Sequence, residues 1–160
     1  MKIAIVTDTW LPEVNGVVTT LRHTVEQLRA AGHELHLVEP GMGFWSLPCP
    51  GYRSIRLCLF PGHRVARLLD SIQADTIHIA TEGPLGLAAR RYCLKRGLDF
   101  TTCYHTRFPE YIRARAPIPL AVSYAWIRRF HRPARRMLVS TPTLAKELTE
   151  RGFTNLAIWG

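Results

Sequence analysis

The sequence predicts an α/β fold built on a doubly wound, mostly parallel sheet with helices on both faces. Predicted strands and helices alternate almost strictly along the chain, and this pattern implies right-handed crossovers between parallel strands. The first predicted strand, residues 3–6, is a continuous apolar run, as is typical of a strand covered on both faces. The 160 residues are 47% apolar and 21% charged, which suits one globular domain over residues 1–160.

In the first half of the chain, hydrophobic spacing predicts each element. Five apolar residues between Val17 and Leu28 fall within about 100° of a helical wheel, and Gly32 is a suitable helix stop. Glycine and proline are frequent in residues 40–51, which predicts a loop. Alternating apolar residues predict the next strand. The expected elements are strands at 3–6, 35–38, 53–60 and 76–80 and helices at 17–31 and 63–73.

In the second half, proline and glycine mark where elements begin and end. Pro84 suits the first turn of a helix that ends at Gly97. Prolines in and beside residues 105–118 predict a loop there. The remaining expected elements are helices at 84–96, 120–131 and 142–150 and strands at 98–104, 137–140 and 156–159.

The composition argues against several classes of protein. No run of about 18 apolar residues is present, so we expect no transmembrane helix. An acid at position 8 and the lack of a cleavable apolar stretch argue against a secretory signal. The four cysteines are widely spaced, which favours reduced thiols in a cytosolic protein. The spacing of histidines and cysteines does not suggest a metal site, so we expect neither a metal nor a cofactor.

Ligands of doubly wound sheets bind beyond the carboxyl ends of the strands, so the segments after strands are candidate sites. The loop that starts at Asp8 leads into a helix at Asn15, Gly16 and Val17, where backbone N–H groups attract phosphate. One glycine is too few for a dinucleotide fingerprint, and no Gly-Lys-Ser/Thr follows. An ordinary strand-to-helix turn explains the same residues equally well.

Two further segments follow predicted strands. His105 can hydrogen-bond a sugar hydroxyl, and Arg107 can clamp a phosphate or carboxylate, although a solvated loop is the alternative. Glu82 can hydrogen-bond an acceptor hydroxyl. Capping of the helix that begins at Pro84 is the interpretation we favour for Glu82.

Most of the positive charge lies in one segment. The net charge is +9, and residues 107–136 hold eight arginines against one acid, Glu110. On the predicted helix 120–131 the arginines lie off the apolar stripe, and this pattern suits an anionic membrane surface. A solvated face and nucleic acid are the alternatives, and we expect no nucleic-acid partner. The predicted membrane contacts are Arg113, Arg115, Trp126, Arg128, Arg129 and Arg132.

Three motifs resemble glycosyltransferase family 4. The run from Ile5 to Leu21, Ile-Val-Thr-Asp-Thr-Trp-Leu-Pro-Glu-Val-Asn-Gly-Val-Val-Thr-Thr-Leu, looks like the start of its bacterial α-mannosyltransferase, diacylglycerol glucosyltransferase and sulfoquinovosyltransferase branch. Tyr104 to Tyr111, Tyr-His-Thr-Arg-Phe-Pro-Glu-Tyr, is similar to that branch's His-Thr-x-Phe-Pro-x-Tyr segment. Val139 to Thr143 resembles a later strand-to-helix turn, so the likeness covers the whole chain in order.

The resemblance implies one half of a GT-B fold, in which two Rossmann-like domains face a cleft. This chain is similar to the N-terminal, acceptor-side domain, and we expect the C-terminal domain, with its Glu-x7-Glu motif and nucleotide site, to be absent from residues 1–160. The resemblance implies that His105 is catalytic and contacts the donor sugar. It implies that Asn15, Gly16 and Val17 approach the donor phosphate. The expected acceptor contacts are Asp8, Glu82, Arg107 and Tyr111.

The implied function is that of a retaining glycosyltransferase, which moves a hexose from a nucleotide-sugar substrate to a lipid or lipid-linked acceptor without a metal. We expect the chain alone to be inactive, cytoplasmic, and peripheral on the inner face of the membrane. Expected partners are the nucleotide sugar through the other domain, a lipid or glycan acceptor, and an anionic membrane. Self-association or a separate C-terminal-domain protein are further expected partners. The alternative is a non-catalytic Rossmann-like module that docks on a membrane or a partner protein.

Overall fold

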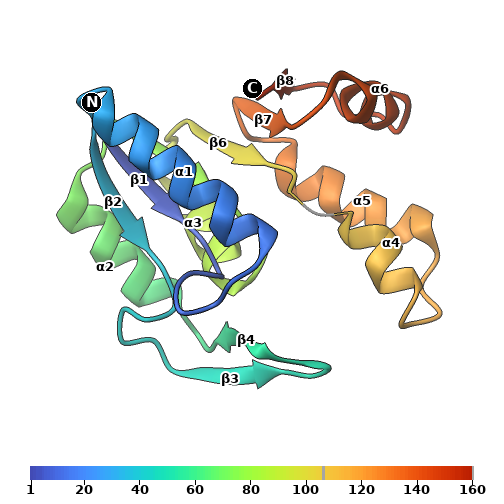
Figure 1. Cartoon of the computed structure of the whole chain (residues 1–160), viewed down its shortest axis with the longest axis horizontal. Coiled ribbons are helices and arrows are strands. Elements are labelled where there is room, and N and C mark those ends of the chain that lie inside the picture. The colour runs from blue at the N-terminus through green and yellow to red at the C-terminus, as the bar shows by residue number, and fades with distance from the viewer. Residues whose placement is uncertain (106, 160) are drawn as a thin grey trace. The chain divides into compact units, whose positions relative to one another are not determined.

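The fold is known from a computed structural model, which describes residues 1–105 and 107–159, with the side chains of residues 52–55 outside the description. The first elements along the chain are β1 (Lys2–Val6), α1 (Gly16–Ala30), β2 (Glu34–Val38), β3 (Ser46–Cys49), β4 (Tyr52–Cys58), α2 (Gly62–Ile72), β5 (Thr76–Ile79) and α3 (Pro84–Arg96). They are followed by β6 (Phe100–Cys103), α4 (Phe108–Arg113), α5 (Leu120–His131), β7 (Arg136–Val139), α6 (Pro142–Glu150) and β8 (Leu156–Ile158) (Figure 1).

The strands form a six-stranded sheet in the order β2-β1-β5-β6-β7-β8 and a separate two-stranded sheet of β3 and β4. β1 pairs in parallel with β2 and β5, and β7 pairs in parallel with β6 and β8. A mostly parallel sheet with helices around it confirms the predicted fold class. The chain divides into two compact units, residues 1–100 and 101–160.

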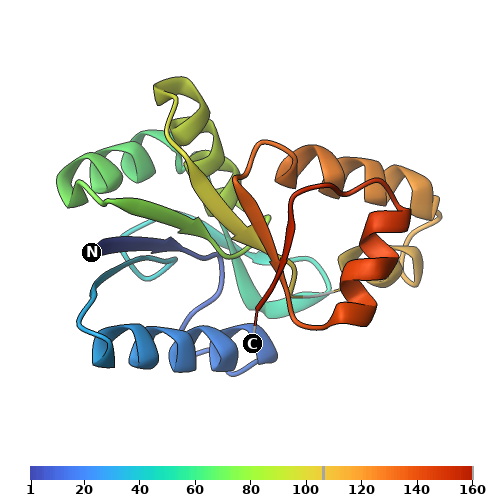
Figure 2. The same cartoon turned by 90° about the horizontal axis from the view of Figure 1, so that it is seen from above.

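In the first unit, β1 is the central strand and is covered on both faces. Ile5 aligns with Leu37 of β2 and His78 of β5, and it is buried. α1 covers one face of these strands, and α2 and α3 cover the other (Figure 2). α1 presents Val18, Leu21 and Val25 to the core, as the helical spacing predicts.

The second unit has its own hydrophobic core. Tyr124 and Ile127 of α5 pack with Met137 of β7 and Leu148 of α6 in one buried cluster. β6 is tied to α5 by a buried hydrogen bond of 2.8 Å between the Thr102 hydroxyl and His131 Nδ1. Both units therefore bury apolar side chains of their own, as compact units do.

Two segments differ from the sequence predictions. The predicted strand at 53–60 does not join the main sheet. It forms β4, which pairs antiparallel with β3 inside the predicted loop at 40–51. The predicted loop at 105–118 contains the short helix α4, because Pro109 occupies its first turn, where proline is tolerated. The predicted helices at 84–96, 120–131 and 142–150 agree with α3, α5 and α6.

The structure also bears on membrane spans and thiols. Within the described residues, no helix is long and apolar enough to cross a membrane. The four cysteines are free thiols. Burial raises the pKa of the Cys58 and Cys93 thiols to about 11, so both are protonated at neutral pH.

Candidate functional site

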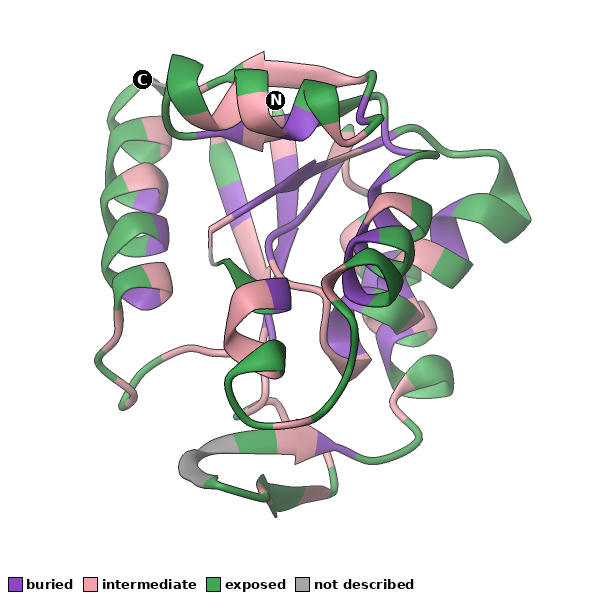
Figure 3. Ribbon diagram, turned by 90° about the vertical axis from the view of Figure 1, so that its right-hand side faces the viewer, coloured by how far each residue is buried: buried purple, intermediate pink, exposed green. Residues whose placement is uncertain are grey.

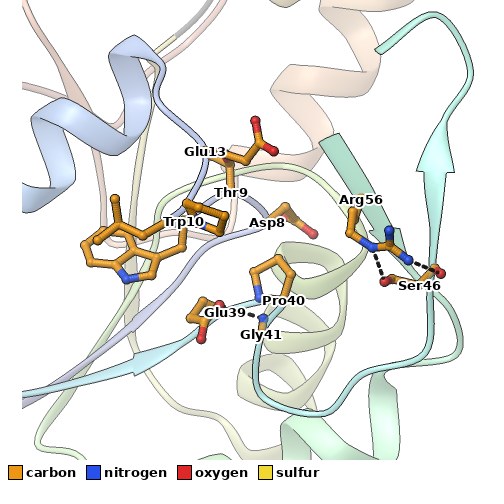
Figure 4. A pocket seen from close by; sticks show the side chains of 11 residues that line it. Asp8, Thr9, Trp10, Glu13, Glu39, Pro40, Gly41, Ser46 and Arg56 are labelled. Atoms are coloured by element: carbon orange, nitrogen blue, oxygen red, sulfur yellow. Dashed lines mark hydrogen bonds between the residues drawn. The ribbon is translucent and has the colours of Figure 1, made fainter. Parts of the chain in front are cut away.

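The first unit has a pocket of about 280 Å³ between the loops that follow β1 and β2 and the β3–β4 hairpin (Figure 4). Trp10 and Glu13 come from the loop after β1, and Glu39 comes from the end of β2. Arg56 of β4 closes another side, where its Nε donates to Ser46 Oγ at 2.7 Å and its Nη2 donates to the Ser46 carbonyl at 3.0 Å. Carboxylate acceptors, a guanidinium donor and an indole face suit a hydroxyl-rich ligand such as a sugar or glycerol.

Asp8 lies at the edge of this pocket, and both of its carboxylate oxygens are bound to the start of α3. Oδ1 accepts from the Leu85 amide at 2.7 Å. Oδ2 accepts from the Thr81 hydroxyl at 2.6 Å and from the Gly86 amide at 3.3 Å. Burial raises the pKa of the Asp8 carboxyl above its ordinary 3.8, although these hydrogen bonds act to lower it. Asp8 therefore fixes the β1 loop against α3.

The helix cap was expected from Glu82, but Asp8 accepts from the first-turn amides of α3. The packing around this cap requires glycine at two positions. A Cβ at Gly83 would lie 2.5 Å from Asp8 Cγ, and a Cβ at Gly86 would lie 1.8 Å from the Thr81 carbonyl oxygen. Asp8 therefore provides hydrogen bonds that the sequence analysis did not foresee, and the roles predicted for Asp8 and Glu82 stay predictions.

The predicted phosphate loop forms a capped helix start. Asn15 is the N-cap of α1, and its Oδ1 accepts from the Val18 amide at 3.0 Å. Its Nδ2 donates to Thr9 Oγ1 at 3.0 Å and so anchors the cap to the β1 loop. Apart from its chain neighbours and the backbone of its own helix, no described atom lies within 4 Å of a Cβ built at Gly16. The Gly16 and Val17 amides begin the helix beside open space, and this geometry suits an anion or water.

His105 lies two residues after the end of β6, and the neighbours of its ring include Cys103 and Trp159. Its Nε2 lies 2.7 Å from Cys103 Sγ. The edge of Trp159 packs against it with ring centroids 5.6 Å apart and an angle of 73°. The side chain is half-buried. Thr106, the next residue of the motif, lies outside the described residues.

The other two motif residues face partners within the second unit. Both terminal nitrogens of Arg107 donate to the Glu147 carboxylate of α6, at 3.2 and 2.9 Å. The Glu147 charge raises the pKa of Arg107. The Arg115 guanidinium lies over the Tyr111 ring at 3.7 Å from its centroid. The guanidinium of Arg107 is therefore engaged by α6, and acceptor binding by Arg107 and Tyr111 stays a prediction.

The predicted membrane residues differ in accessibility. Arg113, Arg115, Arg129 and Arg132 are exposed. Trp126 is 41% exposed and is flanked by the rings of Phe108 and Phe130. Arg128 is half-buried, and its Nη1 donates to the Arg151 carbonyl at 2.8 Å, which ties α5 to the end of α6.

Comparison with known proteins identifies the family. The model of Glycosyltransferase Family 4 matches residues 14–159. The chain belongs to glycosyltransferase family 4. It is similar to the GDP-mannose-dependent alpha-mannosyltransferase of Mycobacterium tuberculosis, with 25% identity over 99% of this chain and 47% of that protein. The enzyme of the same description from Corynebacterium glutamicum is 27% identical over 99% of this chain and 42% of its own length.

A second kind of relative belongs to the same branch. The alpha-monoglucosyldiacylglycerol synthase of Acholeplasma laidlawii is 30% identical over 69% of this chain and 31% of that protein. These relatives confirm the family and the branch that the motifs indicated. The family 4 chain spans less than half the length of the curated relatives it matches.

Several site residues were missed by the sequence analysis. Glu13, Glu39 and Arg56 line the pocket, and Cys103 and Trp159 hold His105. Glu13 follows β1 and Glu39 follows β2, so the rule that ligands bind after parallel strands could have found both. Arg56 could not be found in this way, because it lies inside a strand. Among the described residues, no group of three or more His, Cys, Asp or Glu side chains could hold a metal ion.

Proposed function

We propose that this chain is the acceptor-side domain of a retaining glycosyltransferase that moves a hexose from a nucleotide sugar to a lipid or lipid-linked acceptor. Membership of glycosyltransferase family 4 supports the reaction class. The names of the relatives support GDP-mannose as one donor and a diacylglycerol glycolipid as one product. The observation that carries the proposal is the pocket lined by Trp10, Glu13, Glu39 and Arg56.

In this proposal the pocket orients the hydroxyl that attacks the donor sugar. Glu13 and Glu39 accept hydrogen bonds from acceptor hydroxyls, and Arg56 donates to an acceptor oxygen. Arg56 is suited to this task because Ser46 already fixes its guanidinium. The carboxylate of Asp8 also holds the loop that carries Trp10 and Glu13, beside the acceptor contact predicted for it.

On the donor side, the Gly16 and Val17 amides stabilise the leaving diphosphate, as the positive end of a helix dipole does. His105 contacts the donor sugar and stabilises charge that develops on it. Binding of the nucleotide base and ribose is assigned to a C-terminal domain outside residues 1–160. We therefore propose that residues 1–160 alone do not transfer sugar.

We further propose that the protein is peripheral on the cytoplasmic face of the membrane. Arg113, Arg115, Arg129 and Arg132 are exposed cations, and Trp126 is an exposed aromatic beside them. Each such cation contributes about 1 kcal/mol of attraction to anionic lipid. Self-association of residues 1–160, or binding to a separate C-terminal-domain protein, remains part of the proposal.

A transfer assay tests the proposal. Residues 1–160 are joined to a family 4 donor domain and supplied with labelled nucleotide sugar and diacylglycerol. We expect labelled glycolipid from the joined protein and none from residues 1–160 alone. Combined Glu13→Gln and Arg56→Ala substitutions should raise the KM for acceptor about tenfold or more, because each removed contact is worth about 1 kcal/mol. An unchanged acceptor KM would refute the pocket assignment.

A further inference from the structure

The β3–β4 hairpin has two chemically different faces. Leu47 pairs with Leu57, and the Leu59 amide donates to the Trp45 carbonyl at 2.6 Å. Because side chains alternate along a strand and directly opposed residues share a face, these four residues lie on one face. The pairing of Ser46 with Cys58 defines the opposite face.

The face of Ser46 and Cys58 borders the pocket, with Arg56 of this face exposed and Leu57 of the apolar face half-buried. Cys58 is 3% exposed, and Ser46 lines the acceptor pocket together with Arg56 of the same face. Figure 3 colours the chain by burial, with exposed stretches in green. Three residues of the apolar face are exposed: Trp45 is 84% exposed, Leu47 57% and Leu59 37%. This reverses the usual arrangement, in which the apolar face of a two-faced strand is buried. The reversal indicates that the apolar face meets something other than water.

Phe60, which follows the hairpin, adds a second and independent observation. Its side chain is 96% exposed. Its φ angle is +47°, in the left-handed region that bulky residues rarely adopt. The backbone therefore holds an aromatic ring in solvent at a conformational cost that glycine would avoid, and strain of this kind accumulates at functional positions.

The segment that carries this apolar surface is positively charged, and the acidic residues Glu39 and Asp70 flank it. Residues 40–69 contain four arginines and no aspartate or glutamate. Arg64 and Arg67 of α2 are exposed and follow Phe60 closely in the chain. A second copy of this surface would be repelled by like charge, whereas an anionic lipid surface would be attracted. Tryptophan and phenylalanine bordered by arginine are also typical of side chains at the membrane interface.

We propose that the outward face of the hairpin, formed by Trp45, Leu47, Leu59 and Phe60, docks on an anionic lipid bilayer. Arg64 and Arg67 contact the headgroups. The inference rests on the proposed function in that a lipid acceptor is taken from the same bilayer. The opposite face of this hairpin lines the acceptor pocket, so docking would bring that pocket to the lipid surface. This contact is separate from the arginines of α4 and α5, which belong to the other unit.

A Phe60→Gly variant separates docking from folding. Glycine accepts a positive φ without strain, so we expect the melting temperature to stay the same or rise. We expect partition onto vesicles of phosphatidylglycerol and phosphatidylcholine, measured by co-sedimentation, to fall about tenfold. The reason is that the variant lacks the Phe60 ring, which the bilayer would bury. Leu94→Ala, which removes a 47% exposed apolar side chain on α3, is the matched control and should partition as wild type does.

Tryptophan fluorescence with brominated lipid gives the second measurement. We expect the quenching to fall in Trp45→Phe, because Trp45 lies in the hairpin contact, and the contribution of Trp45 to persist in Trp126→Phe. Wild-type partition by Phe60→Gly, or quenching that depends on Trp126 alone, would overturn the hairpin contact and leave the acceptor pocket unaffected. Loss of a dimer from Phe60→Gly in sedimentation, without vesicle binding by wild type, would also overturn it and assign the face to protein contact. Failure of the transfer assay with intact vesicle binding would overturn the proposed function alone.

Discussion

The Cys103 thiol lies 2.7 Å from Nε2 of His105. An imidazole nitrogen is a stronger acceptor than sulfur, so the expected arrangement has the thiol donating to Nε2. The neutral ring then carries its own proton on Nδ1. Cys103 is buried at the end of β6, so the sheet holds it in place. Its thiol thereby orients the ring of His105 on the loop that follows. The orientation of the proposed catalytic side chain is built into the strand that precedes it.

Loss of this thiol should release the His105 ring. In Cys103→Ala, we expect the ¹⁵N shifts of His105 to move toward a mixture of tautomers, because Nε2 loses its donor. Cys103→Ser retains a donor and should preserve the wild-type pattern. The measurement is a long-range ¹H–¹⁵N spectrum of residues 1–160. Identical His105 shifts in all three proteins would show that the thiol does not set the tautomer.

His105 itself is tested in the protein joined to a donor domain. We expect His105→Ala to lower turnover by an amount equivalent to about 2–4 kcal/mol, the range for loss of one transition-state donor. Nucleotide affinity should change little, because the base and ribose are assigned to the other domain. Turnover and thermal stability are measured on the same sample. Near-normal turnover with a lower melting temperature would indicate that His105 only packs against its neighbours.

The glycines at the start of α3 should be the least replaceable in the first unit. Gly86→Ala forces a Cβ to within 1.8 Å of the Thr81 carbonyl, so we expect a loss of about 3 kcal/mol or more in the free energy of unfolding. Gly16→Ala is the control, because no described atom beyond its chain neighbours and the backbone of its own helix lies within 4 Å of the added Cβ. Urea denaturation should place Gly16→Ala within about 0.5 kcal/mol of wild type. Equal stability of the two variants would contradict the packing around Asp8.

Asp8 should leave a signature in the pH dependence of stability. Burial raises its pKa above 3.8, so the folded state binds this proton more tightly than the unfolded state does. The contribution of Asp8 to the free energy of unfolding is therefore greatest below the pKa that Asp8 has in the unfolded chain. It falls as pH rises through the pKa of Asp8 in the folded protein, and it is constant above that pKa. In Asp8→Asn this decline should disappear, which makes the unfolding free energy less dependent on pH in that range. Parallel curves for the two proteins would refute the raised pKa.

The arginines at the C-terminal end of α5 should differ in what they stabilise: Arg128 the fold, and Arg129 and Arg132 the membrane contact. Arg128→Glu removes the bond from Nη1 to the Arg151 carbonyl, so we expect it to lower the unfolding free energy by about 1–3 kcal/mol. Combined Arg129→Glu and Arg132→Glu substitutions should leave the melting temperature within about 2 °C of wild type and weaken binding to anionic vesicles. Normal vesicle binding by the double variant would remove these residues from the proposed membrane contact.

The regular elements could be predicted from sequence because local spacing determines them. The predictions match three helices, α3, α5 and α6. Each has a proline at or just before its first turn, and each buries one face. The hairpin could not be placed, because alternation does not reveal which face is buried, and here the apolar face is exposed. α4 was missed because its prolines indicated a loop, although Pro109 suits a first turn.

The sequence predicted which loops carry the candidate site residues, but not which distant residues these contact. Asn15, Gly16 and His105 follow strands or begin a helix, and sequence position alone indicates this. The pairing of Arg107 with Glu147 spans 40 residues, and the cap that Asp8 provides to Leu85 spans 77. Contacts of such separation depend on the tertiary fold, so local sequence pattern could not predict either partner.

The central claim is that the pocket beside β1 receives the acceptor. The most direct test titrates ¹⁵N-labelled residues 1–160 with short-chain diacylglycerol and follows the indole N–H of Trp10 and the Nε–H of Arg56. The account predicts saturable shifts of both signals in the wild type. The Trp10 shift should need several-fold more diacylglycerol to saturate in Glu13→Gln and in Arg56→Ala, while the fold is retained. Absence of saturable shifts at these two groups, or shifts that persist unchanged in the variants, would contradict it.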